Sequence, residues 1–179
     1  MRDAKKLKTL VHYVCWKTSD DRVLGAVKLN KSLFFSDLWT YVERGTPLTG
    51  ETYQKREHGP VSTSLLRVLD ELVAEGAIFV RRQLPPHHGR LDVIALTKPD
   101  ITGFTPDEIS LVDDAIHYTC YEHKTHEISE ESHDIIWELA HIGEEIPYHA
   151  MLASELGEVT PEHLEWAKQM ASKAPKVAA

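Results

Sequence analysis

The sequence has 179 residues, of which 42% are hydrophobic and 27% are charged, and its formal net charge is −8. This length fits one globular domain with its own core, and the lack of an apolar run near 18 residues excludes a membrane-spanning helix. The charge is unevenly divided: residues 1–100 carry 16 Lys and Arg against 12 Asp and Glu, and residues 101–179 carry 4 against 16, which disfavours nucleic-acid binding over the whole surface.

The N-terminal region predicts an amphipathic helix over about residues 3–17. Its apolar side chains follow the spacing of one helical face, namely Leu7, Leu10, Val11, Val14 and Cys15. The region lacks the apolar core of a signal peptide, so we expect a mature cytoplasmic protein. Cys15 and Cys120 are too few for a disulfide framework, and we expect them to be free thiols.

The second predicted helix, about residues 26–44, is apolar on most of its circumference. One apolar stripe is widened by three aromatic residues, giving the set Leu29, Leu33, Leu38, Tyr41, Val42, Phe34, Phe35 and Trp39. A helix that is apolar nearly all round belongs in the centre of a domain. Gly45 is a suitable residue to end it.

Residues 51–80 predict a strand, a helix and a second strand. A short polar edge strand at residues 52–56 is followed by a break at His58–Gly59–Pro60. A helix over about residues 60–75 would then place Pro60 in its first turn, where the missing N–H costs nothing. A β-hairpin over about residues 77–97 follows, and a helix followed by such a wing is typical of winged-helix domains.

The rest of the chain is predicted to be helical. Thr105, Pro106 and Glu108 form a capping box at the start of a helix over about residues 106–124. Ser129 is expected to cap a helix over about residues 130–142. A last helix over about residues 161–172 would be followed by a flexible tail at 173–179. We therefore expect one domain over residues 1–175 of the mainly α (α+β) class, helical with a small winged-helix-like hairpin.

Two stretches together resemble a known family. They are "VKLNKSLFFSDLWTYVERGTPLTGETYQKREHGPV" and "ISEESHDIIWELAHIGEEIPY". The positions that carry the likeness are Lys28, Leu29, Lys31, Leu33, Phe34, Phe35, Asp37, Gly45, Tyr53, Gly59, Pro60, Val61, Ser129, Ser132, His133 and Trp137. With the helix and hairpin between them, these stretches make roughly residues 5–150 similar to the Panacea domain of SocA-like antitoxins.

The resemblance implies a function in protein binding. Members of that family bind and neutralise a toxin protein, one branch presents its toxin to an ATP-dependent protease, and such genes also occur in phages. Motif position suggests the following partner-binding residues: Lys28, Lys31, Asp37, Tyr53, His58, Gly59, Pro60, Arg67, Arg81, Arg82 and His133. The acidic second half could steer a basic toxin toward the protein. No cofactor, nucleic-acid partner or membrane partner is expected, and the oligomeric state stays open.

Other functions are weighed against this interpretation. A winged-helix regulator of transcription would use Arg67, Arg81, Arg82 and Arg90 for phosphate contacts, but the second half of that helix is acidic.

A metal site could draw on His117, Cys120, His123 and His126, with His133 or His141 from the next helix. The spacing of these residues matches no established zinc pattern, so we expect no metal. Adjacent Ser132 and His133 point about 100° apart on a helix, and no nucleophile elbow surrounds them. We expect no enzyme.

Overall fold

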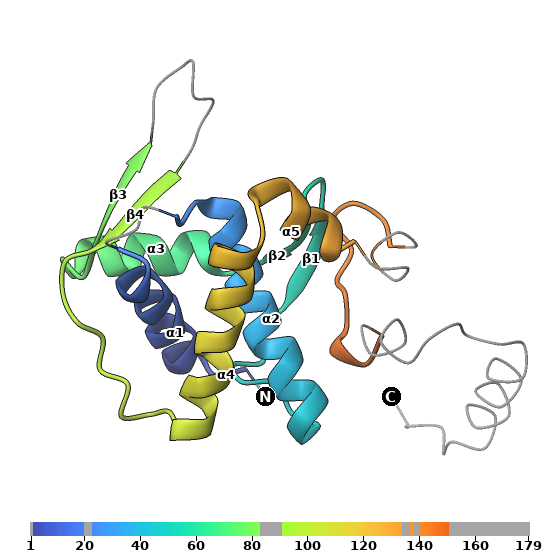
Figure 1. Cartoon of the computed structure of the whole chain (residues 1–179), viewed down its shortest axis with the longest axis horizontal. Helices are drawn as coiled ribbons and strands as arrows, with labels where there is room; N and C mark the ends of the chain where they lie inside the picture. The colour runs from blue at the N-terminus through green and yellow to red at the C-terminus, as the bar shows by residue number, and fades with distance from the viewer. Residues whose placement is uncertain (1, 20–22, 83–90, 134–136, 138–139, 151–179) are drawn as a thin grey trace, which may run out of the picture.

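The computed structural model describes residues 2–19, 23–82, 91–133, 137 and 140–150 of the chain. Helices and strands follow one another along these residues, as Figure 1 shows. Their bounds are α1 Ala4–Lys17, α2 Ala26–Arg44, β1 Tyr53–Arg56, β2 Gly59–Ser62, α3 Leu65–Ala74, β3 Ile78–Arg82, β4 Leu91–Ala95, α4 Pro106–His117, a π-helix Tyr118–Glu122 and α5 Thr125–Glu131. The predicted fold class is confirmed: the domain is mainly α with two small hairpins.

Helix α2 lies at the centre of the described structure. It packs against α1, α4, α5 and the strand β2, as its apolar circumference predicts. Gly45 ends it in the left-handed region, with φ of 70°, where a residue without Cβ is favoured. Twelve of its residues are buried, and these include Lys28, Asn30, Lys31 and Asp37 as well as the apolar ones.

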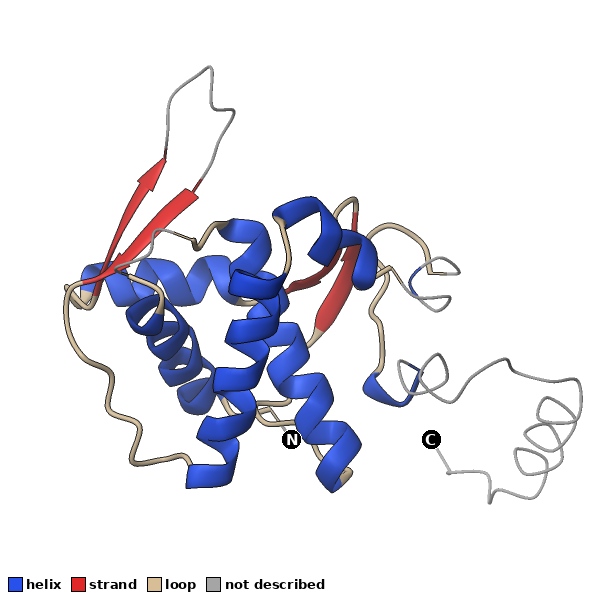
Figure 2. Ribbon diagram, viewed as in Figure 1, coloured by secondary structure: helices blue, strands red, loops and turns tan. Residues whose placement is uncertain are grey.

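The two hairpins occupy separate places on this helical framework (Figure 2). β1 pairs antiparallel with β2, and β3 pairs antiparallel with β4. The first hairpin packs on α2, whereas β3 packs on α3 and β4 packs on α1. A hairpin thus follows α3 directly, and the winged-helix interpretation of that pair stays a prediction.

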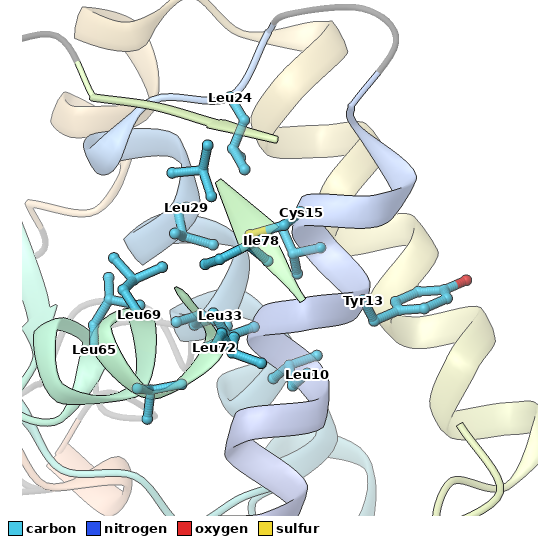
Figure 3. Close-up of a cluster of buried hydrophobic side chains, with 14 of the residues drawn as sticks. Leu10, Tyr13, Cys15, Leu24, Leu29, Leu33, Leu65, Leu69, Leu72 and Ile78 are labelled. Carbon is cyan, nitrogen blue, oxygen red and sulfur yellow. The ribbon is translucent and has the colours of Figure 1, made fainter. Parts of the chain in front are cut away.

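The buried apolar residues form two clusters that meet at α2. In the larger cluster, Leu29 and Leu33 lie among side chains from α1, α3 and β3, as Figure 3 shows. The smaller cluster joins Phe34 and Phe35 of α2 to Tyr53 of β1 and Ile128 of α5. Helix α2 therefore connects the side of the domain that carries α1, α3 and β3 with the first hairpin.

The helix predicted over residues 60–75 is wrong at its start. Residues 59–62 form strand β2, with Pro60 opposite Lys55, and the helix begins only at Leu65. Proline lacks an N–H, but a two-stranded ribbon has a free edge on which none is needed. Pro60 therefore lies in a strand and not in the first turn of a helix.

The predicted bounds of the next two helices also need correction. α4 ends at His117 and passes into the π-helix, which ends at Glu122, although the capping box of Thr105 and Glu108 is confirmed. α5 runs from Thr125 to Glu131, so Ser129 lies inside the helix and does not cap it. Part of the helix predicted at 130–142, the last helix at 161–172 and the tail at 173–179 lie outside the described residues, so the single-domain organisation stays a prediction.

None of the helices in the described part of the chain combines the length and apolar character needed to span a bilayer.

The central packing of α2 predicts an unequal response to two leucine truncations. Leu33 is fully buried and Leu66 is 73% exposed, so Leu33→Ala should lower the free energy of unfolding by about 2–5 kcal/mol. Leu66→Ala should change it by about 0.5 kcal/mol or less. Urea unfolding followed by circular dichroism measures both values, and similar losses in the two variants would contradict the central position of α2.

Candidate functional site

Three stretches far apart in the sequence meet beside the first half of α2. Lys31 comes from α2, Gly59 is the first residue of β2, and Ser132 directly follows α5. Gly59 has φ of 97°, and a methyl group added there would lie 2.0 Å from Nζ of Lys31 and 2.4 Å from Oγ of Ser132. Glycine is favoured on both counts: the backbone conformation disfavours a side chain, and a methyl group would have to displace the Lys31 amine and the Ser132 hydroxyl. We call Lys31, Gly59, Ser132 and the adjoining His133 the Lys31 cluster.

One serine hydroxyl ties α5 to the hairpin, and a second forms a bond at the end of α5 itself. Oγ of Ser129 donates to the carbonyl oxygen of His58 at 2.9 Å, and Oγ of Ser132 donates to the carbonyl oxygen of Ser129 at 2.7 Å. Ser129 therefore holds the turn before Gly59 in place. The hydroxyl of Ser132 is directed to a backbone carbonyl, which gives the Ser132–His133 pair a structural explanation.

The amine of Lys31 is the unusual member of the cluster. The residue is 1% exposed, and within the described part of the chain Nζ has no hydrogen-bond partner. Burial penalises the charged form, which lowers the pKa of Lys31 to about 7. Both the ammonium and the neutral amine form of this lysine are therefore populated near neutral pH.

His133 is held next to this amine by aromatic stacking. Its ring lies 3.6 Å from that of Trp137 at an interplanar angle of 3°, and Nζ of Lys55 lies 4.1 Å from the centre of the Trp137 ring. Burial, together with the positive charges of Lys31 and Lys55, lowers the pKa of His133. The imidazole is therefore favoured in its neutral form.

An open groove of about 640 Å³ runs over Lys31. It is lined by α2 residues within 26–31, by hairpin residues within 56–61 and by Ile142. A second depression of about 490 Å³ lies toward α5 and shares Val27 and His58 with the groove. Exposed His58 therefore lines both hollows, and its backbone is fixed by Ser129.

The other end of α2 carries a buried carboxylate. Asp37 is fully buried and accepts hydrogen bonds from N of Thr49 at 2.6 Å, from Oγ1 of Thr49 at 2.7 Å and from the hydroxyl of Tyr53 at 2.8 Å. Burial raises the pKa of Asp37, and the hydrogen bonds oppose this rise. Burial and the nearby Asp37 raise the pKa of the Tyr53 hydroxyl well above its usual value. Asp37 thus fixes β1 to α2.

Glu51 performs a similar structural role that the sequence did not reveal. Its Oε1 accepts hydrogen bonds from the hydroxyls of Ser62 and Thr63 at 3.1 and 3.0 Å and from N of Ser64 at 3.0 Å. Nε of Arg2 lies 3.1 Å from its other oxygen. The carboxylate therefore binds the start of α3, as a capping side chain would, and no local pattern around Glu51 indicates this long-range contact.

Most of the predicted partner-binding residues are buried in this conformation. Lys28 donates from Nζ to the carbonyl oxygen of Cys120 at 2.8 Å, and Asp37 and Tyr53 bond to each other. Gly59 and Pro60 lie in the buried strand β2, and His133 is half-buried. Their burial gives these residues a structural explanation, and direct partner contact by them stays a prediction.

Three predicted residues are exposed. His58 lies on the rim of the groove. Arg67 on α3 forms an ion pair with Glu71, and Arg81 on β3 forms one with Asp92 at 2.9 Å. The groove lining includes neither arginine. The side chain of Arg82 lies outside the described residues.

The edge of β1 is covered by the protein's own chain. N of Lys55 donates to the carbonyl oxygen of Glu144 at 2.8 Å, N of Gly143 donates to that of Lys55 at 2.9 Å, and N of Ile146 donates to that of Tyr53 at 2.9 Å. The expected partner-binding edge near Tyr53 is therefore already paired. The groove, which the sequence did not indicate, is the accessible surface beside it.

The histidine-rich segment is used for other contacts. Nδ1 of His117 lies 2.9 Å from Oε1 of Glu122, and Nδ1 of His123 lies 2.9 Å from the carbonyl oxygen of Tyr118. Cys120 is buried, and burial raises its thiol pKa. In the part of the chain that the structure describes, His, Cys, Asp and Glu side chains do not come together in groups of three or more suited to a metal ion.

Comparison with protein families identifies the family of this chain. The family model described as "Antitoxin SocA-like, Panacea domain" matches residues 29–138, which include every member of the Lys31 cluster. Comparisons with curated proteins and with solved structures gave no significant match.

The contact between Asp37 and Tyr53 predicts a measurable loss of stability. Tyr53→Phe removes one hydrogen bond from a buried carboxylate and should lower the free energy of unfolding by about 1–3 kcal/mol. Tyr41→Phe is the matched control, because Tyr41 lies on α2, is only half-buried and keeps its ring contact with Tyr148. Urea unfolding compares the two, and equal losses would contradict the anchoring role of Asp37.

Lys31 predicts a distinctive pH dependence of stability. The folded pKa of about 7 lies below the usual 10.5, so between these values the unfolded lysine binds a proton that the folded one does not. The wild type should therefore gain stability as pH rises from 7 to 10.5, by on the order of a few kcal/mol at about 1.4 kcal/mol per pKa unit.

Lys31→Met removes this titration, so its stability advantage over the wild type should be largest at pH 7 and below and should shrink toward pH 10. Lys5→Met, which removes an exposed lysine, is the control and should track the wild type. Urea unfolding across this pH range checks the prediction, which fails if all three curves run parallel.

Proposed function

Because the chain belongs to the SocA-like antitoxin family that shares the Panacea domain, with 29–138 matched, we propose that it is an antitoxin that binds a cognate toxin protein in the cytoplasm and neutralises it. Family membership is the observation that carries this proposal. An antitoxin of this kind acts by binding and not by catalysis. The proposal therefore needs a protein-binding surface and no catalytic centre.

The groove over Lys31 is the best-supported position for the toxin. Its lining joins α2 to the first hairpin, and the half-buried Val61 and the 65% exposed Ile142 offer apolar surface there. Exposed apolar side chains at a concave site favour protein association. A stable complex buries on the order of 1,600 Å² in total, so the toxin would also cover the rim around His58 and the neighbouring depression.

Neutralisation can take two forms. The toxin can be held inactive in a stable complex, or it can be presented to an ATP-dependent protease, as the family resemblance implies for one branch. The amount of toxin in the cell separates these forms, because only delivery to a protease lowers it.

A winged-helix regulator is the competing function. α3 and the β3–β4 hairpin would contact DNA, but Arg67 and Arg81 each pair with an acidic neighbour. A gel-shift assay at moderate salt with the promoter of the protein's own operon tests this alternative directly.

Co-production of the protein with the products of its neighbouring genes tests the antitoxin proposal. We expect one neighbour to arrest growth alone, the wild type to restore growth, and the two proteins to purify together. Val61→Glu, which places a charge in the groove, should abolish both effects, because an unpaired buried charge opposes association.

Leu66→Glu is the matched control, since Leu66 is exposed on α3 outside the groove lining, and it should behave as the wild type. Circular dichroism confirms that both variants fold. If no neighbouring product is toxic or bound, the proposal is refuted, and if Leu66→Glu fails while Val61→Glu succeeds, the groove is the wrong surface.

A further inference from the structure

Lys31 differs from the other buried polar side chains of α2. Those of Lys28, Ser32 and Asp37 all form hydrogen bonds, whereas Nζ of Lys31 has none among the described residues. Burying a cation without a hydrogen-bonded counter-charge is costly. Such a group therefore either destabilises the fold without compensation or pairs with an anionic group that another molecule supplies.

The surroundings of Nζ fit the second explanation. Gly59 contributes no side chain on the hairpin side, and the hydroxyl oxygen of Ser132, which donates its proton to the carbonyl oxygen of Ser129, lies on the α5 side. Lys31 also forms part of the lining of the groove. A group entering the groove would therefore meet the lysine in a largely apolar setting, where an ion pair is stronger than in water.

The charges near Lys31 favour an anion. Lys55, Arg56 and His58 on the hairpin and His133 after α5 are basic or titratable, and Glu57 and Glu130 are the acidic residues facing the two hollows. Lys31 is the buried cation among the residues that line the groove, whereas Arg56 is exposed to water, so a single negative charge is enough to pair with Lys31.

We propose that the groove receives an Asp or Glu side chain of the toxin, whose carboxylate pairs with Lys31. This inference rests on the proposed antitoxin function and adds the chemistry of the partner. The carboxylate would anchor the toxin, and the apolar groove walls would cover its stem and neighbouring side chains.

Pairing makes binding depend on pH. A carboxylate within hydrogen-bond distance favours the charged form of lysine, so binding raises the pKa of Lys31 from about 7 and takes up a proton near neutral pH. Affinity should therefore fall as pH rises above 7. His58 and His133 are further ionisable groups beside the two hollows, and the Lys31→Met variant separates their contribution.

A small carboxylate tests the site without the toxin. Isovalerate is the probe, and isovaleramide is its neutral analogue. The Cε signal of Lys31 in ¹³C-lysine-labelled protein reports its pKa, assigned through Lys31→Met. We expect saturable isovalerate binding at pH 6.5 that raises this pKa, no effect of isovaleramide, no binding to Lys31→Met and normal binding to Lys5→Met.

Three results would overturn the site. They are an unchanged Lys31 signal with isovalerate, equal binding of isovalerate by Lys31→Met, and binding of inorganic phosphate as tight as that of isovalerate.

Measurement of toxin binding then tests whether the group that pairs with Lys31 is an acidic side chain of the toxin. At pH 6.5, Lys31→Met should weaken toxin binding by about tenfold or more, as loss of a charged hydrogen bond does, while Lys5→Met stays within about twofold. The loss should shrink toward pH 9, and replacing one toxin Asp or Glu by its amide should reproduce it. Undiminished binding by Lys31→Met refutes the inference but leaves the antitoxin function standing, and an effect confined to the toxin's C-terminal carboxylate refutes the side-chain assignment. If the wild type binds no neighbouring product, the antitoxin function is refuted. The isovalerate experiment then still decides whether Lys31 binds a carboxylate.

Discussion

The burial of α2 on nearly all sides is the constraint on which the rest of the structure depends. A helix in that position satisfies its buried polar side chains within the protein, because water cannot, and among the described residues of α2 Nζ of Lys31 is the exception. Ser36 and Thr40 do so locally, donating to carbonyl oxygens one turn earlier. Asn30 and Asp37 do so at long range, accepting from Ser62 and from Thr49 and Tyr53. The long-range bonds place the first hairpin along α2, so the polar groups of the helix determine where the hairpin lies.

The same constraint explains why several of the residues that carry the family resemblance lie together in the structure. Asp37 and Tyr53 form one contact between α2 and the hairpin, and Lys31, Gly59 and Ser132 form another between α2, the hairpin and α5. Residues separated by about a hundred positions are thus parts of one packing arrangement. The exposed side chain of His58 takes no part in this arrangement, to which His58 contributes only its backbone carbonyl.

Much of the fold could be predicted because local rules and tertiary packing agree there. The apolar periodicity of α1 and α2 and the capping box of Thr105 are local signals that the structure confirms. Local rules and tertiary packing disagree at Pro60 and Ser129. Pro60 fits the first turn of a helix in isolation, but pairing with β1 and the bonds from Glu51 to the start of α3 favour a strand. The hydroxyl of Ser129 reaches a carbonyl of the hairpin instead of capping a helix. The site was less predictable, because motif position indicates which residues matter and not whether they are exposed: Asp37 and Tyr53 were expected to contact a partner but lie in the interior.

Charge acts on this protein at two ranges, and the two effects differ in sign. The excess of acidic residues in the second half of the chain would act at long range, screened over about 8 Å at physiological salt, and we propose that it affects mainly the rate of encounter. Lys31 is a single cation held under a groove, and its effect is confined to contact distance, where it would select a carboxylate and fix its position. A partner suited to both would be basic over its surface and would carry one acidic side chain at the point of contact. Such a partner would be attracted by one feature and recognised by another, because the long-range charge cannot position a single side chain of the partner and the buried amine of Lys31 acts only at contact distance.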